Sequence, residues 1–217
     1  MSTLRVRYQT MEFGNTDIHL RTLRDNQEFS DDEQIAENLG ISSATWPLFG
    51  IVWPSGEVLA HLMMDYAIEG KRILELGCGI ALSSHVLNHR HADITATDYH
   101  PETQNFLNMN SALNQQNIIP YTRIGWADEK SDLGEFDLII GSDVLYERGH
   151  AEMLSEFINQ HAKAQCEVIL VDPGRGHHAR FSKLMVKLGF SHTQIRPLDI
   201  SYLRLPFPKG HVLTYKR

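Results

Sequence analysis

The chain has 217 residues, only two cysteines and a formal charge of −7. Such an acidic balance disfavours broad nucleic-acid binding, which needs a basic face. Two cysteines are too few for a disulfide scaffold, so we expect a reducing compartment, the cytoplasm. We see neither a secretory signal nor a run of about 18 apolar residues, so no membrane partner is expected.

The N-terminal region predicts a small hairpin and helix. Residues 4–12 and 17–23 have the character of two strands, and Gly14-Asn15-Thr16 between them is a hairpin signal. Ser30 and Glu33 stand at the spacing of a capping box, which predicts a short helix starting there.

From residue 54 onward, helices and short apolar strands alternate. Expected helices are 54–67, 82–88, 102–115, 150–161 and 177–188; expected strands are 71–77, 92–98, 121–124, 135–143, 167–172 and two more before Tyr215, separated by Pro206 and Pro208. This alternation predicts an α/β fold, with a seven-stranded, mostly parallel sheet and helices on both faces.

Ligands of open α/β sheets bind beyond the carboxyl ends of the strands, so the residues there matter most. Gly77-Cys78-Gly79 follows the first strand of the sheet and allows a tight turn with close ligand approach. Asp98 ends the next strand, 21 positions after Gly77 (98 − 77), near the spacing at which an acid meets a ribose hydroxyl. The alternative for Gly77-Cys78-Gly79 is a plain strand–helix turn, and the alternative for Asp98 is a helix N-cap. Interpreting the turn as a dinucleotide-binding fingerprint is less well supported, because the third glycine of that motif would fall at Leu82.

Further candidate residues follow the next three strands. Trp126 and Asp128 stand where an adenine edge would lie, although Trp126 also suits core packing. Asp143 ends a strongly apolar strand, and Tyr146 follows three residues later. A carboxylate in that position requires a partner. Residues 172–175 (DPGR) are interpreted as a turn.

Together these segments resemble the Rossmann-like class I S-adenosylmethionine-dependent methyltransferases. More narrowly, they resemble the family 16 seven-β-strand protein methyltransferases, which mostly methylate lysine. The similar segments are ELGCGIAL, with Ala81 for the last glycine, ITATDYHPE, IGWADEK, with Ala127 where glycine is usual, FGIVWPSGEVLA and the D-x-x-Y signature in EFDLIIGSDVLYE. VDPGRGHHARF is loosely similar to the branch acting on mitochondrial electron-transfer flavoprotein. The resemblance covers Ser43 to Leu188.

The resemblance implies the cofactor S-adenosyl-L-methionine and assigns site residues. Asp143 and Tyr146 would be catalytic and face the acceptor, while Ser142 would act through its backbone. Cofactor contacts would come from Trp53, Gly77, Cys78, Gly79, Asp98, Trp126 and Ser142. Whether Glu75 or Asp128 also contacts the cofactor stays open. Residues 1–45 would form an N-terminal hairpin and cap segment, and 46–217 the methyltransferase domain.

Protein lysine methylation is the favoured function, with a protein substrate bound at the hairpin and at residues 46–53. A small-molecule amine or RNA as acceptor is the first alternative, although the charge makes nucleic acid unlikely. A non-catalytic cofactor-binding interaction protein is the second. The sequence leaves the acceptor atom, degree of methylation and oligomeric state open. No metal is expected, and we interpret His85 and His89 as surface histidines.

Overall fold

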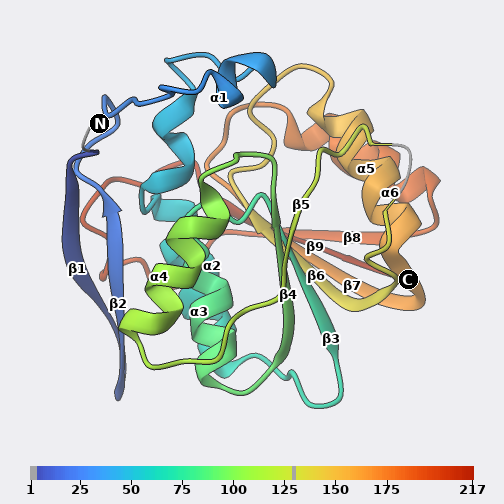
Figure 1. Ribbon diagram of the computed structural model, residues 1–217. Helices are drawn as coiled ribbons and strands as arrows, with labels where there is room; N and C mark the ends of the chain where they lie inside the picture. Colours follow the sequence, from blue (N-terminus) through green and yellow to red (C-terminus); the bar gives the residue numbers. More distant parts are fainter. Residues whose placement is uncertain (1–3, 129–130) are drawn as a thin grey trace.

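The computed structural model describes residues 4–128 and 131–217, which form a two-stranded hairpin and a seven-stranded sheet with helices on both faces (Figure 1). The hairpin strands are β1 (Val6–Phe13) and β2 (Thr16–Leu23). The large sheet has the order β5-β4-β3-β6-β7-β9-β8. Its strands are β3 (Arg72–Leu76), β4 (Asp93–Asp98), β5 (Tyr121–Arg123), β6 (Phe136–Ser142), β7 (Ala162–Asp172), β8 (Ser191–Ile195) and β9 (His211–Lys216).

The first five strands of the large sheet are parallel, and β9 pairs antiparallel with both β7 and β8. The helices are α1 (Ile35–Asn38), α2 (Pro54–Asp65), α3 (Leu82–His89), α4 (Thr103–Leu113), α5 (His150–His161) and α6 (His178–Lys187), with a 3₁₀ turn η1 (Trp46–Gly50). This confirms the predicted α/β fold, the mostly parallel sheet and the N-terminal hairpin.

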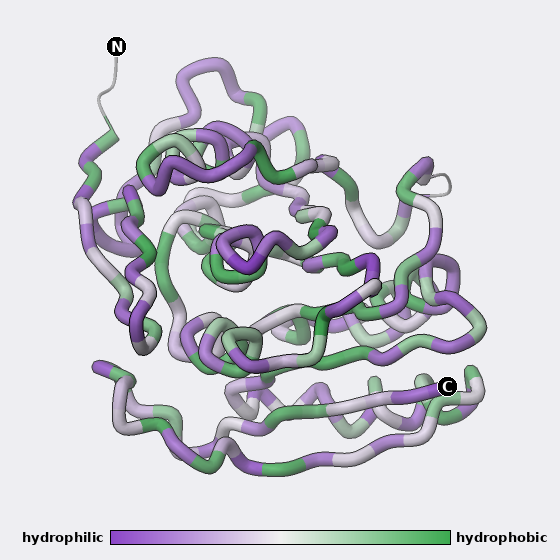
Figure 2. Tube along the Cα trace, turned by 90° about the horizontal axis from the view of Figure 1, so that it is seen from below, coloured by the Kyte–Doolittle hydropathy of each residue, from purple (hydrophilic) through white to green (hydrophobic). Residues whose placement is uncertain are grey.

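The two faces of the sheet carry two separate apolar clusters. Side chains alternate along a strand, so Ile73 belongs to the cluster under α2, α3 and α4, while Leu74 belongs to the one under α5 and α6. Ile140 and Ile139 in β6 divide in the same way. Hydrophobic and hydrophilic stretches accordingly alternate over short distances along the chain (Figure 2). Burial on both faces explains the near-continuous apolar strands.

The predicted capping box at Ser30 and Glu33 is wrong. The helix α1 begins only at residue 35, and the carboxylate of Asp31 accepts hydrogen bonds from the backbone N–H groups of Ala36 and Glu37 (3.1 and 2.8 Å). Ser30 instead donates to Asp32. A carboxylate accepts hydrogen bonds from these unpaired N–H groups as well as a serine hydroxyl would. Asp31 therefore takes the role that the sequence had assigned to Ser30.

The hairpin packs on the main body through buried side chains such as Ile18 and Leu20, and two asparagines of α4 bind its backbone. Asn110 accepts from the N–H of Arg21 (2.7 Å) and donates to its carbonyl (3.2 Å). Asn114 makes the same pair of bonds with His19, both at 2.7 Å. The amide side chains thus bind the free edge of β2 much as another strand would. None of the helices in the described part of the chain has the length and apolar character that crossing a membrane requires.

The interpretation of His85 as a surface residue is wrong. Its side chain is fully buried in α3, where Nδ1 lies 3.2 Å from the amide oxygen of Gln116, whereas His89 is exposed. Both histidines lie on α3, but His89 contacts Thr16 of the hairpin. The helix therefore points one histidine into the core and the other outward, and helical spacing alone did not distinguish them.

Candidate functional site

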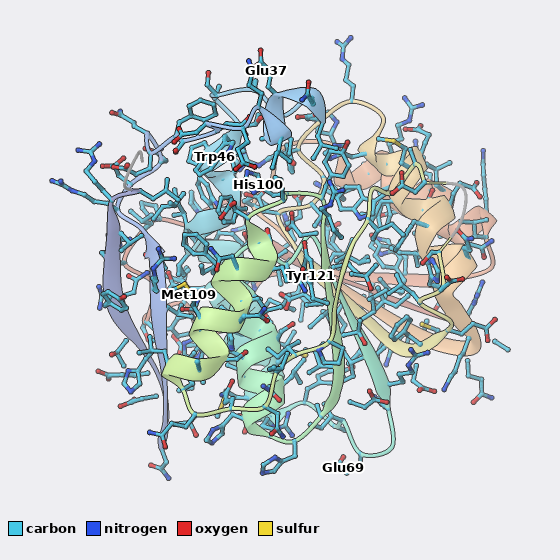
Figure 3. All side chains as sticks on the ribbon, viewed as in Figure 1. Glu37, Trp46, Glu69, His100, Met109 and Tyr121 are labelled. Carbon is cyan, nitrogen blue, oxygen red and sulfur yellow. The ribbon has the colours of Figure 1, made fainter. Side chains whose placement is uncertain are left out.

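A cavity of about 630 Å³ opens at the carboxyl edge of the parallel strands. This volume is within the ordinary range for small-molecule sites, which is about 300–1,000 Å³. In Figure 3, Trp46 and His100 mark this end of the molecule, and Glu69 marks the opposite end. All nine residues predicted for the site line the cavity: Trp53, Gly77, Cys78, Gly79, Asp98, Trp126, Ser142, Asp143 and Tyr146.

The turn between β3 and α3 forms the floor of the cavity. Gly77, Gly79 and Ala81 all have left-handed backbones, with φ of 54°, 53° and 56°. A Cβ on Gly79 would lie 3.0 Å from the carbonyl oxygen of Phe49, and one on Gly77 would lie 3.0 Å from Val144. Both glycines are therefore required by the backbone and by the space above it. Ala81 adopts the conformation in which glycine is usual, which is an unfavourable position for a residue with a Cβ.

Asp98 ties the turn to the end of β4. Its two carboxylate oxygens accept from the N–H groups of Gly79 and His100, both at 2.8 Å. Burial raises the pKa of this carboxyl, while those backbone hydrogen bonds lower it. A carboxylate has about four acceptor positions, so Asp98 retains capacity for hydroxyl donors. The alternative role of Asp98 as a helix N-cap is not observed, because α4 begins at residue 103 and its N-cap residue is Glu102.

Two buried polar groups lie beneath the turn. Glu75 accepts from both the N–H and the hydroxyl of Ser84 at the start of α3, and burial raises the pKa of its carboxyl to about 7. Ser83 lines the cavity with a buried hydroxyl that has no partner among the described residues. A buried hydroxyl without a partner carries a desolvation cost.

The third strand end supplies a short loop with an aromatic neighbour. The N–H of Gly125 donates to the Asp128 carboxylate at 2.7 Å, and a Cβ on Gly125 would lie 3.4 Å from the ring of Tyr99. Tyr99, Trp126 and Asp128 all line the cavity. The segment IGWADEK continues into Glu129 and Lys130, which lie outside the described residues.

Asp143 stands at the fourth strand end with an unexpected partner. Its carboxylate forms two parallel hydrogen bonds with the guanidinium of Arg175, Nε–Oδ1 and Nη2–Oδ2, both at 2.6 Å. Arg175 comes from the loop between β7 and α6, which the sequence analysis interpreted only as a turn. The partner required by a carboxylate in this position is thus an arginine of the same chain.

His150 is a second residue that sequence reasoning missed. Its ring lies edge-on to both Trp126 (5.2 Å between centroids) and Tyr146 (4.7 Å), so it joins two predicted site residues. Its Nδ1 donates to the carbonyl of Val144 at 3.0 Å, which leaves Nε2 facing Glu147 at 3.6 Å. Its position four residues after Tyr146, at the start of a helix, was the available signal.

The segment at residues 46–53 contributes to the cavity wall. The indole N–H of Trp53 donates to the carbonyl of Leu48 at 2.9 Å, so its ring, not its N–H, is free for a ligand. Trp46 is buried and lies near His100 (Figure 3). The two rings are edge-on, and the His100 ring stacks on Phe49 with 4.0 Å between centroids. Of the described residues that line the cavity, none comes from the hairpin.

The fold matches those of known methyltransferases. A methyltransferase structure from Pyrococcus furiosus superposes with a TM-score of 0.59 and 19% identity, covering 85% of this chain and 96% of that one. The magnesium protoporphyrin IX methyltransferase of Synechocystis, solved with bound S-adenosylmethionine, gives a TM-score of 0.57 and 20% identity, covering 74% of this chain and 76% of that one. At these identities, the likeness shows a shared fold.

The chain belongs to the lysine methyltransferase family, whose model matches residues 31–187. An electron transfer flavoprotein beta subunit lysine methyltransferase from Xenopus laevis is 26% identical over 63% of this chain and 55% of that protein. A calmodulin-lysine N-methyltransferase from Arabidopsis thaliana is 25% identical over 82% and 62%. A histone-arginine methyltransferase from Xenopus laevis is 31% identical over 44% of each. The chain spans about half the length of the first of these relatives.

Proposed function

We propose that this chain is an S-adenosylmethionine-dependent methyltransferase that methylates a lysine side chain of another protein. One observation carries the proposal: the glycine turn, Asp98 and the pair Asp143–Tyr146 line the same cavity at the carboxyl edge of the sheet. Family membership and the lysine-methylating relatives support the same function.

The cavity fits the proposed cofactor. Asp98 would accept from the ribose hydroxyls, and the glycine turn allows the close approach that a Cβ would block. The Trp126 ring or backbone would contact the adenine, with Asp128 as acceptor for its amine, and Trp53, Cys78 and Ser142 would complete the contacts. When bound, the cofactor supplies a methyl group already activated as a sulfonium.

The protein's part in transfer is to align the acceptor amine with that methyl group. A lysine of ordinary pKa, about 10.4, is neutral in on the order of one molecule per thousand at pH 7.4, so burial against apolar groups has to increase that fraction. Asp143 would hold and orient the amine, and Tyr146 would position it through its hydroxyl or its ring. Desolvation raises the pKa of Tyr146 to about 12, and its hydroxyl, protonated at neutral pH, can donate or accept a hydrogen bond.

The proposal also includes the cellular compartment, the bounds of the catalytic domain and a second candidate acceptor. The free thiols of Cys78 and Cys166 suit a reducing compartment, for which the cytoplasm is the expectation. Residues 46–217 would be the catalytic domain, preceded by the hairpin and cap segment at 1–45. The arginine-methylating relative makes arginine the second candidate acceptor.

Calorimetric titration with S-adenosylmethionine and with NAD tests the cofactor. We expect micromolar binding of S-adenosylmethionine alone, abolished by Asp98→Ala. Asp93→Ala is the matched control, because Asp93 is exposed at the opposite end of the same strand. Binding of NAD without S-adenosylmethionine would contradict the proposal.

Transfer of labelled methyl groups to lysate proteins tests the acceptor. Acid hydrolysis and chromatography of the labelled protein would separate methylated lysine from methylated arginine and histidine. We expect the label in lysine, dependent on Asp143. Label in a small molecule or in RNA would instead support the first alternative function.

A further inference from the structure

The ion pair between Asp143 and Arg175 is unusual because it occupies the carboxylate that the acceptor needs. Both oxygens of Asp143 are bound by the guanidinium in a bidentate geometry. The side chain of Asp143 is 11% exposed and that of Arg175 is 44% exposed, and both line the cavity. A cation of this chain therefore lies in the place where a cationic acceptor would be held.

The backbone presents Arg175 to the cavity by a fixed turn. Arg175 lies between Gly174 and Gly176, which have φ of 92° and 95°. The N–H of Gly174 donates to the buried carboxylate of Asp172 at 2.8 Å, and a Cβ there would lie 2.6 Å from Lys209. The turn is thus anchored on the Gly174 side, while the guanidinium itself reaches solvent.

Given the proposed function, we infer that Arg175 is a specificity-determining residue that competes with the acceptor amine for the carboxylate of Asp143. An uncompensated Asp143 would bind an ammonium strongly and hold its proton, which opposes transfer. With Arg175 present, an ammonium has to displace the guanidinium to reach Asp143, so the acceptor site holds a cation less tightly than a free carboxylate would. The exposed guanidinium can move into water when the acceptor arrives.

The test compares two cofactor analogues by calorimetry. Sinefungin carries a primary amine in place of the transferable methyl group, whereas S-adenosylhomocysteine carries none. The ratio of their dissociation constants therefore reports how well the acceptor site binds a cation, without any need for turnover or for the natural acceptor.

Arg175→Gln is expected to tighten sinefungin binding about three- to tenfold relative to S-adenosylhomocysteine, whose affinity stays unchanged. Arg175→Lys retains the charge and should give a ratio close to the wild type. Asp143→Asn should weaken sinefungin selectively, and Arg175→Gln added to it should change nothing further.

Arg180→Gln is the matched control, because Arg180 pairs with Glu152 between α6 and α5 and does not line the cavity. It should leave the ratio unchanged. An unchanged ratio in Arg175→Gln, or equal loss of both analogues, would show a purely structural ion pair and overturn the inference while leaving the proposed function intact. Failure of the wild type to bind either analogue would overturn both.

Discussion

Asp143 combines a partly enclosed carboxylate with a left-handed backbone, and both properties bear on how it can be tested. Its φ is 53°, and its N–H donates to the carbonyl of Val171 at 2.9 Å. Asparagine tolerates this backbone region better than most residues and keeps the side-chain volume. Alanine would add backbone strain to the loss of the carboxylate, so Asn is the cleaner substitution.

We predict that Asp143→Asn lowers methyl transfer on the order of 100-fold, because the acceptor amine is no longer oriented. Affinity for S-adenosylmethionine should stay nearly unchanged, since Asp98 and the glycine turn are untouched. Single-turnover transfer of labelled methyl and calorimetry on the same sample measure the two quantities. Loss of both would contradict the role of Asp143 and point to a disturbed cavity.

Site residues could be predicted where a single strand end carries the signal. Gly77 and Asp143 directly follow a strand and Asp98 ends one, and parallel topology brings such ends together. Arg175 and His150 were missed because their importance lies in pairing between two loops. The order of the parallel strands decides which loops meet. No local pattern in DPGR records that Arg175 lies opposite Asp143, and none at the start of α5 records that His150 contacts Trp126.

At the scale of elements, the turn from β3 to α3 depends on a backbone conformation that glycine adopts without strain. We predict that Gly79→Ala destabilises the protein by about 1–2 kcal/mol through the left-handed backbone. The contact with the Phe49 carbonyl adds to this, and cofactor affinity should fall as well. Urea denaturation and calorimetry measure the two effects.

Gly70→Ala is the matched control for that prediction. Gly70 has a φ of 69° at the other end of β3, and a Cβ there would meet nothing within 4 Å. It should carry the backbone penalty alone and bind the cofactor normally. Equal effects of the two substitutions on binding would show that the turn does not cradle a ligand.

The attachment of the hairpin to α4 leads to a prediction on local stability. Asn110→Ala should cost about 1–3 kcal/mol, because it leaves the backbone groups of Arg21 without partners beside a buried helix face. Amide hydrogen exchange at Arg21 should accelerate more than exchange in β6. Asn108→Ala, an exposed asparagine of the same helix, should change neither. Unchanged exchange in Asn110→Ala would mean that apolar packing alone holds the hairpin.

Helices and strands could be predicted where the hydrophobic period and the length of the segment indicate the same element. How the elements pack against one another could not be predicted in this way. The strands and helices of the large sheet follow apolar patterns that burial on one or two faces imposes. The extension of β7 back to residue 162 is polar and exposed in part, so its pattern does not resemble a buried strand. The hairpin docks through buried apolar residues such as Ile18 and Leu20 and through two asparagine amides of α4, and those amides have no hydrophobic signature.

At the scale of the whole molecule, buried histidines and buried glutamates have opposite effects on the free energy of unfolding as the pH falls. Burial lowers the pKa of His85 to about 4 and that of His100 to about 3, so acid favours the unfolded chain, where both histidines are protonated more readily. Burial raises the pKa of Glu57 and of Glu75 to about 7. These glutamates bind protons in the folded state at a higher pH than in the unfolded state, so mild acid favours folding. Between about pH 4.5 and 6.5 the two contributions have opposite signs.

Glu75→Gln separates these contributions, because glutamine has the volume of glutamate and its carbonyl can still accept from Ser84. Above pH 7 the wild-type protein carries a buried carboxylate, and the variant does not. We expect the ligand-free variant to be more stable than the wild type by about 1–3 kcal/mol at pH 8, with the advantage shrinking as the pH falls and gone near pH 4.5. Urea denaturation of both proteins at pH 5 and pH 8 measures it, and the histidine contribution cancels in the difference.

Glu69→Gln, an exposed position at the far end of the sheet (Figure 3), should give a difference that does not vary with pH. A pH-independent difference for Glu75→Gln would mean that this carboxyl is already neutral, or already solvated, throughout the range.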